Sequence, residues 1–280
     1  MMQPATPPLI LIHILAKDKA GMLPDWLKIN LDRLDYPRSR IILYFRTNNN
    51  NDATAEIIHE WVDRQHKNPG TVAPYNWQEW KEIILDDTDL TVPLQNYGVH
   101  EWNPVRFKAL AHLREEGINL AILKEVDFYY TVDVDNFTLP NTLKSLVAHN
   151  VPIVAPLISC ADPEQTVYAN YHNRIADDGY YLDVSDSSKA AYFMILSGEV
   201  KGLIDCGTIH CTYLIRKDLL PRVKYTDGTD NYEYAIFSRR LRQLGIPQYL
   251  DNTTVYGCLT LRENLEVCIE RMKELGLQGY

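Results

Sequence analysis

The stretch "FYYTVDVDNFTLP", residues 128–140, decides how this sequence is interpreted. An apolar run leads directly into two aspartates, Asp133 and Asp135, with one valine between them. Residues i and i+2 of an extended segment project to the same face, so the two carboxylates lie side by side. Neighbouring carboxylates repel each other unless a cation lies between them. The stretch therefore predicts a strand that presents two acids either to solvent or to something positive.

The segments on both sides of this stretch alternate between strand and helix patterns. Apolar runs predict strands at 9–16, 40–47, 126–132 and 151–158. Apolar residues at helical spacings predict a first helix that begins at residue 23 or 24, and a second that begins after a cap at Asp52 or a neighbouring asparagine. Further helices are predicted at 106–123, 138–150 and 231–245, and at the C-terminal end. This alternation predicts parallel crossover units and an open twisted sheet with helices on both faces. Ligands of such sheets bind at the carboxyl ends of strands, where the two aspartates fall.

The connections give further expectations. We expect Thr138 to cap the 138–150 helix, with Pro140 in its first turn, and Gly245 to close the 231–245 helix. Polar loops dominate 160–200, a strand leads to a helix start in 207–218, and 246–260 is extended. Because no internal repeat, low-complexity tract or linker interrupts the pattern, we predict a single domain over residues 1–280.

Composition narrows the class of partner. The formal net charge of −9 argues against a nucleic acid or an anionic membrane surface as the main partner. The 9–16 run has no basic region before it and is too short to span a bilayer, and "LGLQGY" at the C-terminus carries no retention signal. The sequence thus predicts a soluble chain of unknown compartment, with a homodimer as one possible assembly. The five cysteines lack zinc-binding spacing and predict no disulfide scaffold, although a single bridge stays open.

Three other interpretations of the paired aspartates were weighed. A calcium-binding EF-hand loop needs glycine at its sixth position and glutamate at its twelfth, where Thr138 and Lys144 stand. A phosphatase with a phosphorylated aspartate usually carries the motif on its first strand, before a small β-branched residue; here Phe137 takes that place in mid-chain. An Asx-type turn that caps the next helix stays open. Mg²⁺ or Mn²⁺ suits the pair best, because both prefer oxygen ligands.

Several segments beyond the pair resemble the GT-A glycosyltransferases, and within them the collagen galactosyltransferases that glycosylate hydroxylysine. They are 14–61, "VDVDN" (132–136), "VPIVAPLI" (151–158), "YANY" (168–171), "DGYY" (178–181), "IHCTYL" (209–214) and the 231–246 helix. The resemblance implies a GT-A-like, Rossmann-type nucleotide-binding sandwich whose central sheet is mixed and mostly parallel. It also implies transfer of galactose, with inversion, from UDP-galactose to hydroxylysine of a collagen-like polypeptide, with Mn²⁺ or Mg²⁺ as cofactor. The alternatives are a UDP-glucose-dependent transferase with another acceptor, and a non-catalytic sugar- or collagen-binding module.

The resemblance also assigns roles to individual positions. It implies that Asp133 and Asp135 bind the metal ion, and that His210 helps to bind metal, donor or acceptor. It implies that the UDP-sugar is lined by Ala16, Lys17, Asp18, Asn48, Arg114, Asp133 and Val134. The structural alternatives are a turn residue at Asn48, a solvated arginine at Arg114 and a core histidine at His210.

Inversion needs a general base near the acceptor hydroxyl. The family carries an Asp-Asp pair at the start of the 231–245 helix, where this sequence has Tyr232 and Glu233. Asp230 or Glu233 is therefore the candidate base, with Asp227 less favoured. A family histidine is also missing before Tyr256 and Gly257, so that His210, Asp251 or water would have to replace it as a metal ligand.

Overall fold

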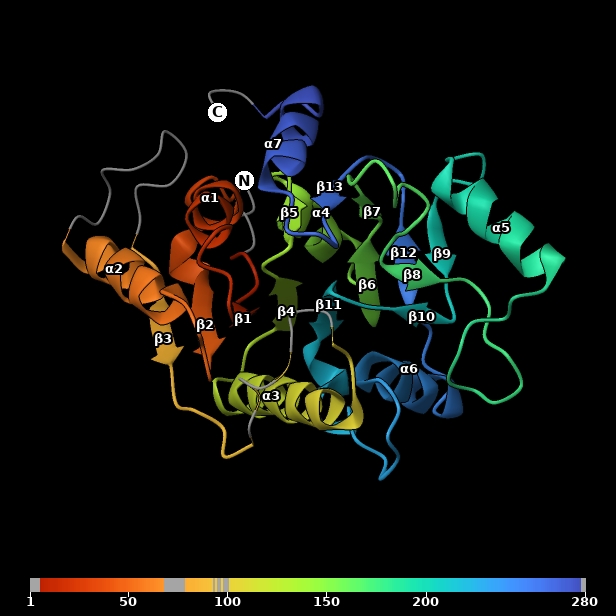
Figure 1. The fold of residues 1–280 in the computed structure, drawn as a ribbon, viewed down its shortest axis with the longest axis horizontal. Helices are drawn as coiled ribbons and strands as arrows, with labels where there is room; N and C mark the ends of the chain where they lie inside the picture. The colour runs from red at the N-terminus through yellow and green to blue at the C-terminus, as the bar shows by residue number, and fades with distance from the viewer. Residues whose placement is uncertain (1–5, 68–78, 93, 95–96, 98–100, 278–280) are drawn as a thin grey trace.

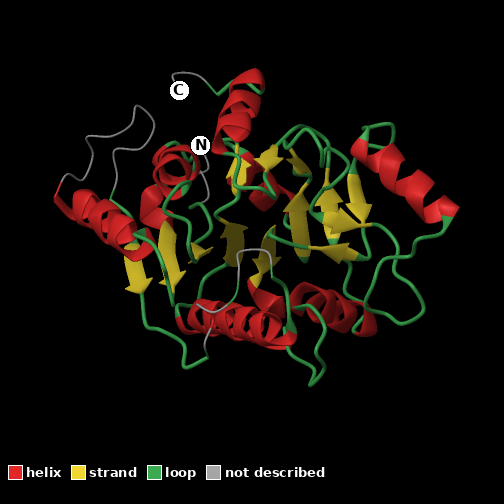
Figure 2. Cartoon of the chain, in the orientation of Figure 1, coloured by secondary structure: helices red, strands yellow, loops and turns green. Residues whose placement is uncertain are grey.

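A computed structural model of the chain describes residues 6–67, 79–92, 94, 97 and 101–277. The expectations about a leader and a retention signal fall partly on the first five and last three residues, which lie outside the described residues. Figure 1 shows a central sheet between two groups of helices, and Figure 2 shows the same layers by type of secondary structure. No described helix is long and apolar enough to cross a membrane.

The central sheet has eight strands in the order β3-β2-β1-β4-β11-β6-β12-β9. These strands are β1 (Ile10–Ala16), β2 (Ile41–Thr47), β3 (Glu82–Asp86), β4 (Phe128–Asp133), β6 (Ile153–Pro156), β9 (Leu203–Asp205), β11 (Thr212–Arg216) and β12 (Tyr249–Asp251). β1 runs parallel to β2 and to β4, whereas β11 runs antiparallel to both of its neighbours, β4 and β6. The mixed, mostly parallel sheet predicted from the sequence is therefore confirmed.

Two smaller sheets and the helices complete the fold. The small sheets contain β5 (Asn136–Thr138), β13 (Gly257–Leu259) and β7 (Ser159–Cys160) in one, and β10 (Thr208–Ile209) and β8 (Tyr171–His172) in the other. The helices are α1 (Leu23–Trp26), continued by the π-helical η1 (Leu27–Asp32), α2 (Thr54–Lys67), α3 (Pro104–Leu123), α4 (Thr142–His149), α5 (Asp186–Leu196), α6 (Glu233–Gln243) and α7 (Leu265–Glu274). Two 3-10 turns span Arg38–Arg40 and Lys217–Arg222.

Each face of the central sheet carries its own hydrophobic core. Alternate residues of β1 point to opposite faces, so Ile10, Ile12 and Ile14 join a core that includes side chains of α1, α2, α4 and α7. Leu11, between them, joins a second core that includes side chains of α3, α5 and α6. Because both faces are covered, the strands are continuously apolar, and this explains why they were recognisable in the sequence. All five cysteines are free.

Two local expectations are wrong. Thr138 does not cap a helix; it ends β5, which pairs antiparallel with β13. Asn141 precedes α4 instead, so Pro140 lies before the helix and not in its first turn. The β5 pairing partner lies more than a hundred residues away, so no local pattern announces it. The second error is the loop expected over 160–200, which contains α5. That helix begins after Ser185, which forms its N-cap by accepting a hydrogen bond from Ser188 N.

Candidate active site

A cavity of about 620 Å³ opens at the carboxyl ends of β1, β2 and β4. Ala16 ends β1, Asn48 follows β2, and Asp133 ends β4, and all three line this cavity. The parallel pairing of these strands brings their ends to one edge of the sheet. The cavity is also lined by the other candidate residues Lys17, Asp18, Arg114, Val134, Asp135, His210 and Glu233. Asp230 is not among its lining residues.

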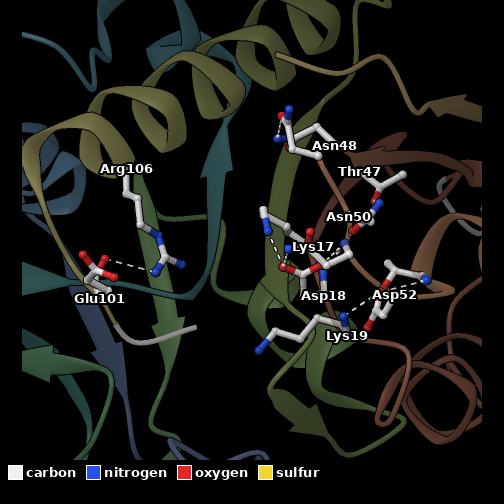
Figure 3. Close-up of polar contacts among 12 residues, drawn as sticks. Lys17, Asp18, Lys19, Thr47, Asn48, Asn50, Asp52, Glu101 and Arg106 are labelled. Carbon is white, nitrogen blue, oxygen red and sulfur yellow. Dashed lines mark hydrogen bonds and ion pairs between the residues drawn. The ribbon is translucent and has the colours of Figure 1, made fainter. Parts of the chain in front are cut away.

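The loop after β1 is tied to the loop after β2 (Figure 3). Asp18 N donates to Asn50 Oδ1 at 3.0 Å, and the Asp18 carboxylate accepts from Asn51 N and from Lys17 Nζ. The φ of Asp18 is 54°, a left-handed conformation that non-glycine residues adopt only when their surroundings hold them there. Two further backbone donors of this loop bind side chains of the second loop: Lys19 N to Thr54 Oγ1 and Ala20 N to Asp52 Oδ2.

Arg114, on α3, holds Asp133 in place. Its Nη2 lies 3.0 Å and 3.2 Å from the two carboxylate oxygens, and its Nη1 donates to Thr131 Oγ1 at 2.8 Å. Arg114 Nε also lies 3.6 Å from Glu233 Oε1. Burial lowers the pKa of this guanidinium, but Asp133 and Glu233 outweigh burial and raise it. One buried cation thus joins a carboxylate of the paired aspartates to the first residue of α6.

Asp135 differs from Asp133 in its surroundings. Its Oδ1 is buried and has no hydrogen-bond partner among the described residues. Burial raises the pKa of Asp135 to about 6, against the lowering effect of Lys19 and with a further rise from Asp133. A buried polar atom without a partner is costly, so an unmet ligand or ion is the natural explanation. The two carboxylates therefore fit a hard divalent cation.

The chain supplies few other metal ligands. In the described part of the chain, no group of three or more His, Cys, Asp and Glu side chains is arranged to hold a metal ion. His210 lines the cavity; burial lowers its pKa to about 3 and so keeps the imidazole in the neutral form that can bind a metal, and its Nδ1 lies 2.8 Å from Cys211 Sγ. Asp251 is occupied by hydrogen bonds to His149, Tyr256 and Thr253 and does not line the cavity. His210 therefore stays a candidate metal ligand beside the two aspartates.

The two candidate bases lie in different surroundings. Glu233 is 4% exposed and lines the cavity, and its Oε2 is buried without a hydrogen-bond partner among the described residues. Burial raises the pKa of Glu233, and Arg114 opposes that rise. The Asp230 side chain is 63% exposed and pairs with Lys108 Nζ at 2.6 Å. The less favoured Asp227 accepts a hydrogen bond from the Tyr180 hydroxyl at 2.8 Å and also does not line the cavity.

Several lining residues were missed in the sequence. They include Lys19, Arg46, Trp102, Arg106, Gln165, Tyr168, Tyr232, Tyr234 and Arg262. The Arg106 guanidinium lies over the Trp102 ring at 4.6 Å, and Figure 3 shows Arg106 across the site from the loop that follows β1. The sequence has 18 tyrosines and 6 phenylalanines, and this surplus of tyrosine favours an aromatic, polar cavity. Composition alone does not indicate which tyrosines line it.

Comparison with known proteins identifies sequences related to this chain. A sequence profile described as glycosyltransferase family 25, N-terminal domain, matches residues 7–272. Human procollagen galactosyltransferase 2 is 32% identical over 279 aligned residues, which cover 94% of this chain and 41% of that protein. Human inactive glycosyltransferase 25 family member 3 is 26% identical, with coverage of 91% and 41%. The chain therefore spans about two fifths of the length of these curated relatives.

Solved structures share the fold at low sequence identity. Staphylococcus aureus TarS 1–349 in complex with UDP-GlcNAc has a TM-score of 0.56 at 12% identity, over 97% of this chain and 61% of that one. Mannosyltransferase PcManGT from Pyrobaculum calidifontis, in complex with GDP-Man and Mn²⁺, has a TM-score of 0.52 at 13% identity, over 90% and 57%. These matches establish the GT-A-type fold of this chain.

Proposed function

The chain belongs to glycosyltransferase family 25, and on that premise we propose that it transfers galactose from UDP-galactose to hydroxylysine of a collagen-like polypeptide. One observation carries the proposal. Two buried carboxylate oxygens without partners among the described residues, Asp135 Oδ1 and Glu233 Oε2, belong to residues that line one cavity at the carboxyl edge of the sheet. A sugar transfer needs both a site for the leaving diphosphate and a base for the acceptor hydroxyl, and these two oxygens are suited to those tasks.

The donor occupies the part of the cavity near β1 and β2. A volume of about 620 Å³ accommodates a nucleotide sugar. Ala16, Lys17, Asp18 and Asn48 contact the nucleoside in this proposal, and the hydrogen bonds between their two loops keep that surface rigid. Asp133 and Asp135 would hold Mn²⁺ or Mg²⁺. Such an ion, when bound, neutralises charge on the leaving diphosphate as a Lewis acid.

The acceptor reacts on the other side of the sugar. Its hydroxyl transfers a proton to Glu233 Oε2 as the oxygen bonds to the anomeric carbon. The bond from that carbon to the diphosphate oxygen breaks, and UDP leaves with the electron pair. Attack from the face opposite to the diphosphate inverts the configuration. Burial raises the pKa of Glu233 and so makes it a stronger base than an exposed carboxylate.

Release of UDP from UDP-galactose and UDP-glucose, with Mn²⁺ and with or without a hydroxylysine peptide, tests this function. We expect release that depends on the peptide and is faster with UDP-galactose. Faster release with UDP-glucose, or with a different acceptor, would favour the alternative transferase. Binding of UDP without any transfer would favour a non-catalytic module. The experiment includes the non-catalytic alternative because some relatives are named as inactive.

A further inference from the structure

Lys19 places a positive charge inside the cavity that contains the paired aspartates. It lines this cavity together with Asp133 and Asp135, and its side chain is 15% exposed. Its Nζ donates to Glu263 Oε1 at 2.7 Å. An ammonium group has three N–H donors, and Glu263 is its hydrogen-bond partner among the described residues. Two donors are therefore left for a ligand.

Acids from two parts of the chain keep Lys19 charged. Burial lowers the pKa of the ammonium, but Asp135, Glu263 and Asp133 outweigh burial and raise it. The ammonium is thus a permanent cation in the field of the carboxylates at the end of β4.

Glu263 is held near Lys19 by the segment that precedes α7. The buried Asp162 carboxylate accepts hydrogen bonds from Thr260 Oγ1 at 3.0 Å and from Leu261 N at 2.7 Å. Glu263 itself has a φ of 56°, a left-handed conformation. The Lys19–Glu263 ion pair therefore joins the loop after β1 to this C-terminal segment beside the cavity.

We propose that Lys19 is a resident cation of the donor site, which binds the diphosphate of the nucleotide and lets the site hold UDP before any metal ion enters. This inference rests on the proposed function for the nature of the donor. The ammonium has N–H donors for phosphate oxygens and lines the same cavity as both aspartates. The same charge repels a divalent cation that approaches Asp135 when no nucleotide is present. Lys19 thus favours nucleotide binding and opposes metal binding in the empty site.

Because Lys19 should strengthen UDP binding and weaken Mn²⁺ binding, removal of its charge should change the two affinities in opposite directions. UDP binding in EDTA and Mn²⁺ binding without nucleotide are measured by calorimetry on the wild-type chain, Lys19→Met and Lys19→Arg. We expect Lys19→Met to weaken UDP binding about tenfold or more, the loss of one charge-assisted hydrogen bond. We expect the same variant to bind Mn²⁺ more tightly, whereas Lys19→Arg keeps both affinities near wild type.

Two more variants control the result. Lys144→Met removes the same charge and an ion pair with Asp35 from an exposed position. We expect it to leave both affinities unchanged. Glu263→Gln keeps the Lys19 charge and removes the negative charge of its partner, so we expect tighter UDP binding in EDTA. Thermal unfolding followed by circular dichroism identifies a variant that fails to fold. Glu263→Gln then carries the test if Lys19→Met does not fold.

The inference is overturned if Lys19→Met and Lys144→Met bind UDP equally well in EDTA, or if Lys19→Met weakens UDP and Mn²⁺ alike, as a merely structural residue would. Its failure is separable from that of the proposed function. A wild-type chain that transfers galactose with Mn²⁺ but does not bind UDP in EDTA contradicts only the role of Lys19. One that binds UDP in EDTA through Lys19 but transfers no sugar contradicts only the transferase.

Discussion

Arg114 Nη2 lies 3.0 Å from Asp133 Oδ1, although 19 residues separate them along the chain. The contact forms because α3, which carries Arg114, packs on the face of β4 and β11 where Thr131 and Tyr213 also lie, so that the guanidinium reaches the end of β4. Asp133 is therefore not a freely solvated turn residue. Its orientation is determined by a buried cation that also approaches Glu233.

Removal of this cation should destabilise the fold strongly. Arg114→Met leaves Asp133 and the buried Glu233 without their counterion, and we expect a loss of about 3–5 kcal/mol in the free energy of unfolding. Urea denaturation measures it. Arg216→Met is the matched control, because Arg216 pairs with Asp218 on the exposed surface, where a loss below about 1 kcal/mol is expected. Equal losses in the two variants would contradict the bridging role of Arg114.

Glu233 and Asp230 should differ sharply in their effect on transfer. Glu233→Gln removes the proposed base and keeps the size of the side chain, so we expect kcat to fall by about 10²–10⁴ while UDP affinity stays near wild type. Asp230→Asn changes an exposed residue and should keep kcat within about twofold of wild type, as is usual for a surface change away from the chemistry. Initial-rate kinetics of UDP release decide between them. The reverse pattern would move the base to Asp230.

Asp135 should be needed for metal binding more than for folding. Its buried Oδ1 has no partner among the described residues, and burial raises its pKa to about 6, so the fold gains little from its charge. We expect Asp135→Asn to abolish detectable Mn²⁺ binding in electron paramagnetic resonance titrations and to stop Mn²⁺-dependent transfer. The midpoint of thermal unfolding should not fall. Retention of wild-type Mn²⁺ affinity in this variant would remove Asp135 from the metal site.

Stability should decrease in mild acid because of buried histidines, of which His13 is one. This side chain is fully buried, stacks on Tyr44 and contacts the Tyr129 hydroxyl through Nδ1 at 2.7 Å; burial lowers its pKa well below 6.5. Below about pH 6.5 the His13 imidazole binds a proton in the unfolded chain but stays neutral in the folded chain, so stability falls as the pH falls. The contribution approaches about 1.4 kcal/mol per pH unit. His13→Gln should flatten the dependence measured by urea unfolding between pH 7 and 5, whereas the exposed His66→Gln should not. An unchanged slope in His13→Gln would refute this assignment.

Gly257 should tolerate no side chain. Its φ is 151°, and a Cβ built there would lie 1.9 Å from the backbone oxygen of Phe137 on the paired strand β5, next to the register partner Thr138. We expect Gly257→Ala to destabilise the fold by more than about 3 kcal/mol, since backbone must move. At Gly21 a Cβ would meet nothing within 4 Å, so Gly21→Ala should change stability by less than about 1 kcal/mol. Thermal or urea unfolding compares the pair, and similar values would contradict the close approach of the two strands.

The sequence by itself determined the layers of the fold and one part of the site. Apolar strands and periodic helices are local patterns, because the periods of 2.0 and 3.6 residues follow from backbone geometry within a short segment. Local patterns also placed Asp133 and Asp135 at a strand end. They identified Gly245, which has a φ of 65°, as the residue that closes α6. They also placed Ala16 and Asn48 after the first two strands, and parallel pairing brings both to the cavity.

Only the tertiary structure decided which polar groups meet. Glu233 and Asp230 are three positions apart, and nothing local distinguishes them, yet one is buried in the cavity and the other pairs with Lys108 outside it. Lys19 and Glu263 are separated by 244 residues, and their ion pair exists because sheet order and the Asp162 hydrogen bonds bring the two segments together. Such pairings arise from the path of the whole chain, and so the charge of each site residue could not be assigned from its neighbours in sequence.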